Sequence, residues 1–205
     1  MTNIKAANLN PKIVVPLNVY NPLMNRKSTI GIVLAGGLSS RMGQDKALLP
    51  WGTGTLLDHM IGLLKASDLE TVVVCGERPG YPSFPDPEPG QGPGIAIGHH
   101  LASLAPDAWA LVVPVDMPLL TPRLIRRLLG DPEQPHRAAY FDDYPLPALL
   151  PARDSAGQPL RGISLRALHL ATGSRPIPLD EDDRPAFLNV NTPENMEQAR
   201  EAWAR

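Results

Sequence analysis

Three short, continuous runs of apolar residues constrain the fold of this chain more than any other feature. They cover residues 29–35, 71–76 and 108–117. A strand with a helical layer on both of its faces is apolar at nearly every position, as parallel strands are. Between the runs, residues 56–67 and 94–104 place their apolar side chains at helical spacing. This alternation predicts βαβ units and an α/β fold built on a parallel sheet.

Cap residues support the helices, and the spacing of the remaining patterns outlines the rest of the chain. Thr55, Thr121 and Thr192 precede helical patterns, and a proline follows the last two, as in the first turn of many helices. The proline-rich segment 78–93 is expected to form a loop, because proline breaks helices and central strands. Farther along we expect strands at 138–143, 146–151, 175–179 and 186–190, and helices at 121–129, 160–171 and 192–204.

The length of 205 residues is sufficient for one such domain with a sizeable core. We therefore predict a single three-layer α/β/α domain with a mostly parallel, Rossmann-like sheet over residues 29–205. Residues 1–28 contain asparagines and prolines without clear periodicity. For them we expect a poorly ordered extension, with a short edge strand as the alternative.

The charge and cysteine totals exclude several classes of protein. Nineteen Lys and Arg against 21 Asp and Glu leave a formal charge of −2, which argues against a nucleic-acid partner. No apolar run approaches the roughly 18 residues of a membrane span, so we expect no membrane partner. The single cysteine, Cys75, excludes an internal disulfide and fits a reducing compartment. A cytoplasmic protein is the expectation.

The first apolar run leads into an unusual turn, which reads LAGGLSSRMGQDKALL over residues 34–49. Gly36 and Gly37 allow backbone N–H groups to approach a ligand closely, because they carry no Cβ. Arg41 and Lys46 add two positive charges, a combination that suits a polyphosphate. The glycine spacing fits neither a Walker A loop nor the dinucleotide fingerprint. The alternative is an ordinary strand-to-helix loop with surface charges.

Polar residues that follow the other strands extend this pattern. Asp116 comes at the end of the third run, where a carboxylate can hold Mg²⁺ while phosphates and water complete the coordination. Its alternative role is to begin a turn. Asn189 and Asn191 have the spacing of one strand face, and their amides suit phosphate, ribose or pterin edges. The alternative for them is a strand end followed by a helix cap.

The turn at residues 34–49 resembles the signature of nucleotidyltransferases, and within that group it is most similar to the molybdenum cofactor guanylyltransferases of the MobA type. Every fixed position of the family pattern is present, from Leu-Ala-Gly-Gly through Arg-Met-Gly to Asp-Lys and two leucines. The motifs VDMPLL, GPGIAIGHHLASL and FLNVNTPENMEQA extend the resemblance over about residues 29–204. Gly94 and Ile95 depart from the usual Gly-Pro-Leu-Ala-Gly of the family.

The resemblance implies roles for individual residues. It implies a nucleotide-diphospho-sugar transferase type of fold, with Arg41, Lys46 and Asp116 as catalytic residues and Asp116 as the metal ligand. Cys75 stands where the family often has asparagine, so we expect a buried, inert thiol there, with contact to the nucleotide as the alternative. Asp86 aligns only through a proline-rich loop. The implied nucleotide-binding residues are Leu34, Ala35, Gly36, Gly37, Lys46, Cys75, Asp86 and Asp116, and the implied substrate-binding residues are Asn189 and Asn191.

The reaction that the resemblance implies is the transfer of GMP from GTP to the terminal phosphate of molybdopterin, with release of pyrophosphate. Mg²⁺ is the expected cofactor, with Mn²⁺ as an alternative ion. Other proteins of molybdenum cofactor synthesis and recipient molybdoenzymes are the expected partners. A CTP-dependent cytidylyltransferase, another small nucleotidyltransferase and a non-catalytic nucleotide-binding protein are the alternatives.

Two other clusters carry weaker signals. His99 and His100 are adjacent on a helical pattern and point to different faces, so we expect an ordinary core or surface pair and not a metal site. Residues 180–185 are acidic. We expect a solvated loop there, with a second metal cluster as the alternative.

Overall fold

The computed structural model describes residues 29–36, 45–86, 88–130 and 136–204. The expected extension at residues 1–28 lies outside these ranges, and so do Gly37 and Arg41 of the glycine-rich turn. The prediction made for each of them therefore stays a prediction.

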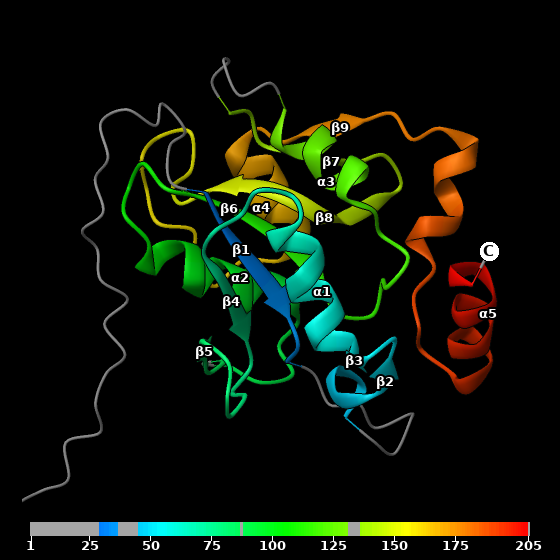
Figure 1. Ribbon diagram of the computed structural model, residues 1–205. Helices are drawn as coiled ribbons and strands as arrows, with labels where there is room; N and C mark the ends of the chain where they lie inside the picture. The colour runs from blue at the N-terminus through cyan, green and yellow to red at the C-terminus, as the bar shows by residue number, and fades with distance from the viewer. Residues whose placement is uncertain (1–28, 37–44, 87, 131–135, 205) are drawn as a thin grey trace, which may run out of the picture.

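A seven-stranded sheet forms the centre of the molecule (Figure 1). Its strands lie in the order β5-β4-β1-β6-β8-β7-β9. Only β8 runs antiparallel to its two neighbours, β6 and β7, while the other pairs are parallel. The predicted, mostly parallel sheet is thus confirmed. The strands are β1 (Thr29–Leu34), β4 (Val72–Cys75), β5 (Ser83–Phe84), β6 (Trp109–Pro114), β7 (Ala139–Phe141), β8 (Tyr144–Pro151) and β9 (Arg175–Ile177).

Helices cover both faces of the sheet and complete the three predicted layers (Figure 1). Residues of α1 (Leu56–Lys65), α3 (Pro122–Leu129) and α5 (Pro193–Trp203) share one apolar cluster with one face of the strands. Residues of α2 (Pro93–Ser103) and α4 (Leu165–Thr172) share a second cluster with the other face. The alternation of side chains along a strand explains this division, because neighbouring residues point to opposite faces. In β6, for example, Leu111 and Val113 belong to the first cluster, and Ala110 and Val112 to the second.

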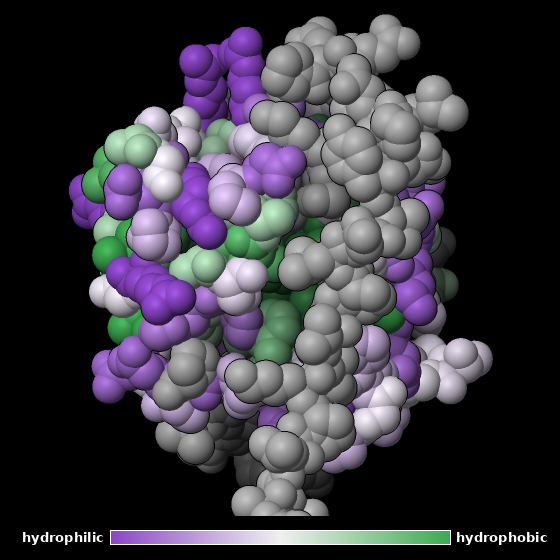
Figure 2. All heavy atoms as spheres, turned by 90° about the vertical axis from the view of Figure 1, so that its left-hand side faces the viewer, coloured by the Kyte–Doolittle hydropathy of each residue, from purple (hydrophilic) through white to green (hydrophobic). Residues whose placement is uncertain are grey.

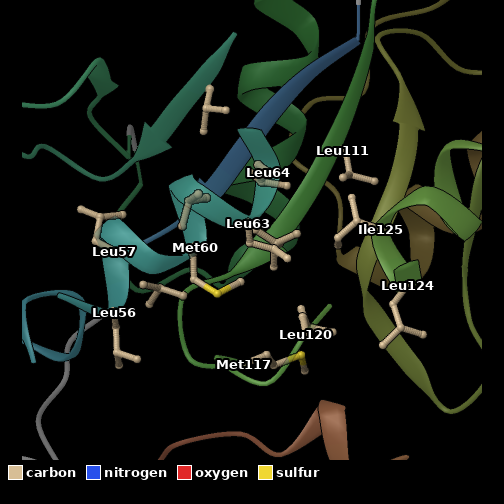
Figure 3. Packing of buried hydrophobic residues seen from close by; sticks show 14 of the residues in the cluster. Leu56, Leu57, Met60, Leu63, Leu64, Leu111, Met117, Leu120, Leu124 and Ile125 are labelled. Carbon is tan, nitrogen blue, oxygen red and sulfur yellow. The ribbon is translucent and has the colours of Figure 1, made fainter. Parts of the chain in front are cut away.

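The larger of the two clusters fills the space between α1, α3 and the sheet (Figure 3). Met60 and Leu64 of α1 are fully buried, as are Leu111 of β6 and Ile125 of α3. Fully burying such a side chain stabilises the fold by about 1.5–3 kcal/mol relative to leaving it exposed. Met117 and Leu120, which follow β6, belong to the same cluster and lie at the lower side of the view in Figure 3. The residues that directly follow Asp116 are therefore anchored in the core by Met117 and Leu120.

Threonine caps begin three of the helices, as the sequence predicts. The side chains of Thr55, Thr121 and Thr192 accept hydrogen bonds from backbone N–H groups in the first turns of α1, α3 and α5. Pro122 and Pro193 occupy the first turn, where a missing N–H costs nothing. The positions at which these elements begin therefore follow from local chemistry.

Three expected elements differ from the structure. The proline-rich segment contains the short strand β5, which extends the sheet by pairing with β4. The expected strand at residues 186–190 is wrong, because residues Glu181–Phe187 form the 3-10 helix η2. Phe187 and Val190 are buried, which explains the strand-like pattern, but they belong to the first apolar cluster without being strand residues, and the Phe187 ring packs against Phe141 of β7 and Tyr144 of β8. Helix α4 begins at Leu165 and not near residue 160, since Ser164 caps it.

Short elements lie between β1 and α1 in the sequence. They are the 3-10 helix η1 (Lys46–Leu48) and a hairpin of β2 (Pro50–Trp51) and β3 (Gly54–Thr55). Within the described ranges, no helix is both long and apolar enough to cross a bilayer. On the side that Figure 2 presents, hydrophilic residues are interspersed with hydrophobic ones.

Candidate functional site

The carboxyl ends of three neighbouring parallel strands, β1, β4 and β6, frame the candidate site. Beyond the ends of the strands, the Ala35 N–H donates to the Cys75 carbonyl at 2.9 Å, and the Val115 N–H donates to the Leu34 carbonyl at 3.1 Å. These bonds continue the ladder past β1 and hold the three strand ends side by side. In open α/β sheets, ligands bind outside this edge.

Two glycines allow the chains that leave β1 and β4 to approach each other closely. Gly76 has φ +109°, and a Cβ on it would lie 2.9 Å from the Gly36 nitrogen. Gly36 itself is exposed. A Cβ on Gly36 would lie 3.9 Å from a carboxylate oxygen of Asp86, so the proline-rich segment brings Asp86 to this edge. The predicted residues Leu34, Ala35, Gly36 and Asp86 are therefore neighbours in space.

Lys46, Asp116 and Asn191 come together although they are far apart in the sequence. The Lys46 ammonium lies 3.5 Å from an Asp116 carboxylate oxygen and donates to the Asn191 side-chain carbonyl at 2.5 Å. The side chains of Lys46 and Asp116 are 16% and 23% exposed, which leaves both accessible to a ligand. Asp116 also accepts, through its backbone carbonyl, a 2.8 Å hydrogen bond from the N–H of Val190. This bond ties the Asn189–Asn191 segment to the end of β6.

Cys75 is a member of the second apolar cluster, and its side chain is buried. Burial raises the pKa of the thiol to about 12, and the charge of Asp86 adds to the shift. The thiol is therefore protonated at neutral pH and is not a nucleophile. This matches the expectation of a buried, inert thiol, while the backbone carbonyl of Cys75 accepts from the Ala35 N–H at the end of β1.

Asp45 and Arg78 also lie at this edge. Asp45 is the aspartate of the Asp-Lys pair in the turn at residues 34–49, but neither residue is among the predicted site residues. An Arg78 nitrogen donates to the Ala35 carbonyl at 2.6 Å and lies 3.0 Å from an Asp45 carboxylate oxygen. Asp45 also caps η1, because its carboxylate accepts from the Ala47 N–H at 3.1 Å. A cap before Lys46 can be recognised in the sequence, but the partner 33 residues away cannot.

The two weaker clusters of the sequence are structural. The His100 ring is buried against Phe84, and His99 bonds Glu88 on the outside of α2. Asp183 is buried and paired with Arg123 and Arg127 of α3, so the expectation of a solvated acidic loop is wrong at this residue. In the part of the chain that the structure describes, no three His, Cys, Asp or Glu side chains form a metal-binding group.

Taken together, the edge offers one carboxylate, one ammonium, one side-chain amide and exposed backbone at Gly36. A carboxylate suits a hard divalent cation, and the ammonium suits phosphate oxygens. The Asp116 carboxylate pairs with the Lys46 ammonium and not with a histidine that could activate a nucleophile. The site is thus equipped to bind and orient a charged phosphate ester by electrostatic means.

Comparisons with known proteins agree with this description. Residues 31–173 match the family model described as a MobA-like NTP transferase domain. The chain is 42% identical over 172 residues to a molybdenum cofactor guanylyltransferase of Xanthomonas euvesicatoria pv. vesicatoria, covering 80% of this chain and 90% of that protein.

Two solved structures share the fold. One is molybdopterin-guanine dinucleotide biosynthesis protein A from Archaeoglobus fulgidus, with a TM-score of 0.63 and 21% identity over 85% of this chain and 98% of that one. Another is a Mycobacterium tuberculosis protein in complex with manganese, with a TM-score of 0.56 and 18% identity over 84% and 97% of the two chains.

Proposed function

Because the chain belongs to the family of MobA-like NTP transferases, we propose that it transfers GMP from GTP to the terminal phosphate of molybdopterin. The observation that carries the proposal is the convergence of Lys46, Asp116 and Asn191 at the carboxyl edge of the sheet. The name of the Xanthomonas relative supports guanine as the base and the molybdenum cofactor as the acceptor.

The chemistry is an in-line displacement at the α-phosphorus of GTP. An oxygen of the acceptor's terminal phosphate forms the new P–O bond, and the bond to the bridging oxygen of the β-phosphate breaks, so pyrophosphate leaves with that electron pair. The attacking phosphate is ionised at neutral pH, and no protein base is needed. Catalysis then rests on positioning and on neutralising charge.

Each residue of the site takes a part in this scheme. The backbone at Leu34, Ala35, Gly36 and Gly37 and the neighbouring Asp86 would hold the nucleotide. Lys46 and Arg41 would neutralise the triphosphate and the departing pyrophosphate. Asn189 and Asn191 would orient the acceptor. The contact between Asn191 and Lys46 supports this arrangement, since the residue proposed for the acceptor lies beside the residue proposed for the triphosphate.

A divalent cation fits the residues at this edge. Asp116 supplies a partly exposed carboxylate, and Mg²⁺ commonly uses one or two carboxylates together with substrate phosphates and water. When bound, Mg²⁺ or Mn²⁺ would withdraw negative charge from the phosphates during transfer. The manganese complex of the Mycobacterium tuberculosis protein supports a divalent cation in this fold.

The decisive experiment is a pyrophosphate-release assay with molybdopterin and Mg²⁺, in which GTP, CTP, ATP and UTP are compared in parallel. We expect release with GTP well above that with the other three. A preference for CTP would move the chain to cytidylyl transfer. Release with none of them would leave a nucleotide-binding protein without this activity. Transfer of the product to recipient molybdoenzymes is part of the proposal and follows only from a positive result.

A further inference from the structure

Arg78 lies in the turn after β4 and joins segments from three parts of the chain. Its guanidinium donates to the carbonyls of Ala35 and Glu77, at 2.6 and 3.1 Å, and to the carboxylate of Asp45 at 3.1 Å. The turn that carries it is fixed by Ser83 of β5, whose hydroxyl accepts from the Arg78 N–H at 3.1 Å. Arg78 is thus anchored at its backbone and reaches across the end of β1.

The same carboxylate that binds Arg78 holds the segment that carries Lys46. Asp45 is the N-cap of η1, and one of its oxygens, Oδ1, accepts from both the Ala47 N–H and Arg78. Lys46 is the first residue of η1, and its ammonium lies beside Asp116. A continuous series of contacts therefore runs from Arg78 through Asp45 to the cation of the site.

Arginine has the shape that this position requires. A planar guanidinium can donate in several fixed directions at once, whereas a lysine ammonium acts as a compact point charge. The three acceptors of Arg78 belong to the end of β1, to the turn after β4 and to the cap of η1. Ala35 lies near the start of the turn at residues 34–49, and Asp45 lies in its second half. Arg78 therefore binds that turn at two points.

We propose that Arg78 is a positioning residue for the transfer reaction: through Asp45 it fixes η1 and thereby holds the Lys46 ammonium beside Asp116. This inference rests on the proposed function for its catalytic consequence. Arg78 does not replace Lys46 as a phosphate-binding cation, because its guanidinium is directed to Ala35, Glu77 and Asp45.

The test measures Arg78→Ala alone and in a Lys46→Ala background, with kcat and KM for GTP, unfolding midpoints, and Mg²⁺–GTP affinity by calorimetry. We expect the single substitution to lower kcat by about 10–100-fold, because small displacements of a reacting group have effects of this size. In the Lys46→Ala background, Arg78→Ala should lower kcat by less than about threefold. The reason is that the effects of two residues that act through the same group are not additive. Arg78→Lys should restore only a small part of the loss.

Arg153 provides the matched control. Its guanidinium also donates to backbone carbonyls, those of Leu101, Leu104 and Ala152, but at the opposite edge of the sheet. Arg153→Ala should lower the unfolding midpoint and leave kcat and KM unchanged. If Arg78→Ala behaved like this control, the positioning role would be overturned.

Two further outcomes separate the inference from the proposed function. An equal loss of kcat with and without Lys46 would overturn the route through Lys46 and indicate a direct contact of Arg78 with the nucleotide. If the unsubstituted protein released no pyrophosphate, the proposed function would fail, and calorimetry would still test the positioning. The inference then requires that Arg78→Ala weaken Mg²⁺–GTP binding only when Lys46 is present, and equal weakening in both backgrounds overturns it.

Discussion

Lys46 and Asp116 place opposite charges 3.5 Å apart at the edge where β1 and β6 end. Both side chains are more than three-quarters buried and yet accessible. Charges in such a position act on a bound ligand more strongly than they would in water, because the surrounding protein lowers the local dielectric. Their contribution to the reaction is therefore expected to exceed their contribution to stability.

Replacing either charge should separate function from folding. We expect Lys46→Ala and Asp116→Ala each to lower kcat by about 10²–10³-fold, the range for removing one preorganised electrostatic group. Steady-state pyrophosphate release measures the loss, and circular dichroism verifies the fold. Asp107, an exposed residue near the opposite end of β6, is the control, and Asp107→Ala should retain full activity. Turnover at the unsubstituted rate in either site variant would refute the mechanism.

His100 should make the stability of the protein depend on pH. Burial lowers its pKa to about 3, and the neighbouring His99 contributes to the shift, whereas the ordinary value is 6.5. The unfolded chain therefore binds a proton below pH 6.5 that the folded chain does not. The stability contributed by neutral His100 is complete above pH 6.5 and is lost progressively as the pH falls towards 3.

The expected size of this effect at pH 5 is about 2 kcal/mol, since each pKa unit corresponds to roughly 1.4 kcal/mol. Urea unfolding of the unsubstituted protein and of His100→Leu, at pH 7.5 and pH 5, measures it. The variant should lose less stability between the two values. Identical losses would mean that His100 is already protonated in the folded protein.

At the scale of single residues, the sequence indicates which residues are candidates for the site better than it indicates which residues contact one another. Asp116 and Asn191 stand out because each follows an apolar segment at a place where a strand is expected to end. The pairing of Asp45 with Arg78 cannot be predicted from the sequence, because it depends on how two turns approach across the end of β1. Gly36 and Gly76 permit this approach. In the sequence, a glycine can indicate that another segment comes close, but it does not indicate which segment.

Helix packing depends on two glycines of α2. A Cβ on Gly94 would lie 2.2 Å from the Leu165 nitrogen of α4, and a Cβ on Gly98 would lie 2.1 Å from the Leu160 carbonyl oxygen. Backbone atoms cannot move aside as the flexible end of a side chain can, so a methyl group at either position would overlap with α4 or the segment before it. This contact gives a reason for glycine at position 94, where the sequence departs from the family pattern: it lets α4 lie directly against the first turn of α2.

Alanine substitutions should therefore have opposite effects in two helices. Gly98→Ala should destabilise the protein by about 2 kcal/mol or more, as overpacking does. A Cβ added to Gly62 of α1 would meet no atom within 4 Å, and Gly62→Ala should stabilise the protein by about 0.5–1 kcal/mol. Thermal unfolding of both variants measures the difference. Equal effects of the two substitutions would contradict the close packing of α2 on α4.

Elements with their own local signals were predictable, and elements that depend on distant partners were not. The caps at Thr55 and Thr121 depend on side-chain oxygens within the first turn of each helix. Strand β5 exists only because β4 offers it an edge, and the prolines around it by themselves indicate a loop. The segment around Phe187 and Val190 shows the reverse, since buried residues need not belong to a strand.

Over the whole molecule, η2 and the residues that follow it lead the chain from β9, at one edge of the sheet, back to the site. Asp183 anchors this course through its buried carboxylate, which pairs with Arg123 and with Arg127 at 2.9 Å. Arg127 also donates to the Pro178 carbonyl at 2.7 Å and lies over the Phe141 ring. The segment with Asn189 and Asn191 follows directly after this anchor.

Removing the Asp183 carboxylate should lower the stability of the protein and weaken binding of the acceptor. We expect Asp183→Ala to destabilise the protein by about 1–3 kcal/mol, because Arg123 and Arg127 lose the carboxylate that accepts their hydrogen bonds. Its KM for molybdopterin should rise more than its KM for GTP. Asp182 is exposed and adjacent, so Asp182→Ala is the matched control and should change neither. A parallel rise of both KM values would show that the anchor does not act on the acceptor side selectively.

The layered architecture was predictable, since apolar runs that alternate with helical stripes have few other solutions. The order of the strands was not. Inserting the antiparallel β8 between β6 and β7 depends on pairings such as Trp109 with Pro151, which no local pattern specifies. The convergence of Lys46 and Asn191 depends on the same topology.

The contact between Lys46 and Asn191 joins residues 145 positions apart, and Arg200 of α5 reaches back to the Pro50 carbonyl over 150 positions. This order has a consequence for synthesis of the protein. A nascent chain acquires every strand of the central sheet before Asn191 and α5 emerge from the ribosome. The sheet can therefore begin to form around a site that is still incomplete, and Asn191, which we propose to orient the acceptor, emerges only after all of the sheet's strands.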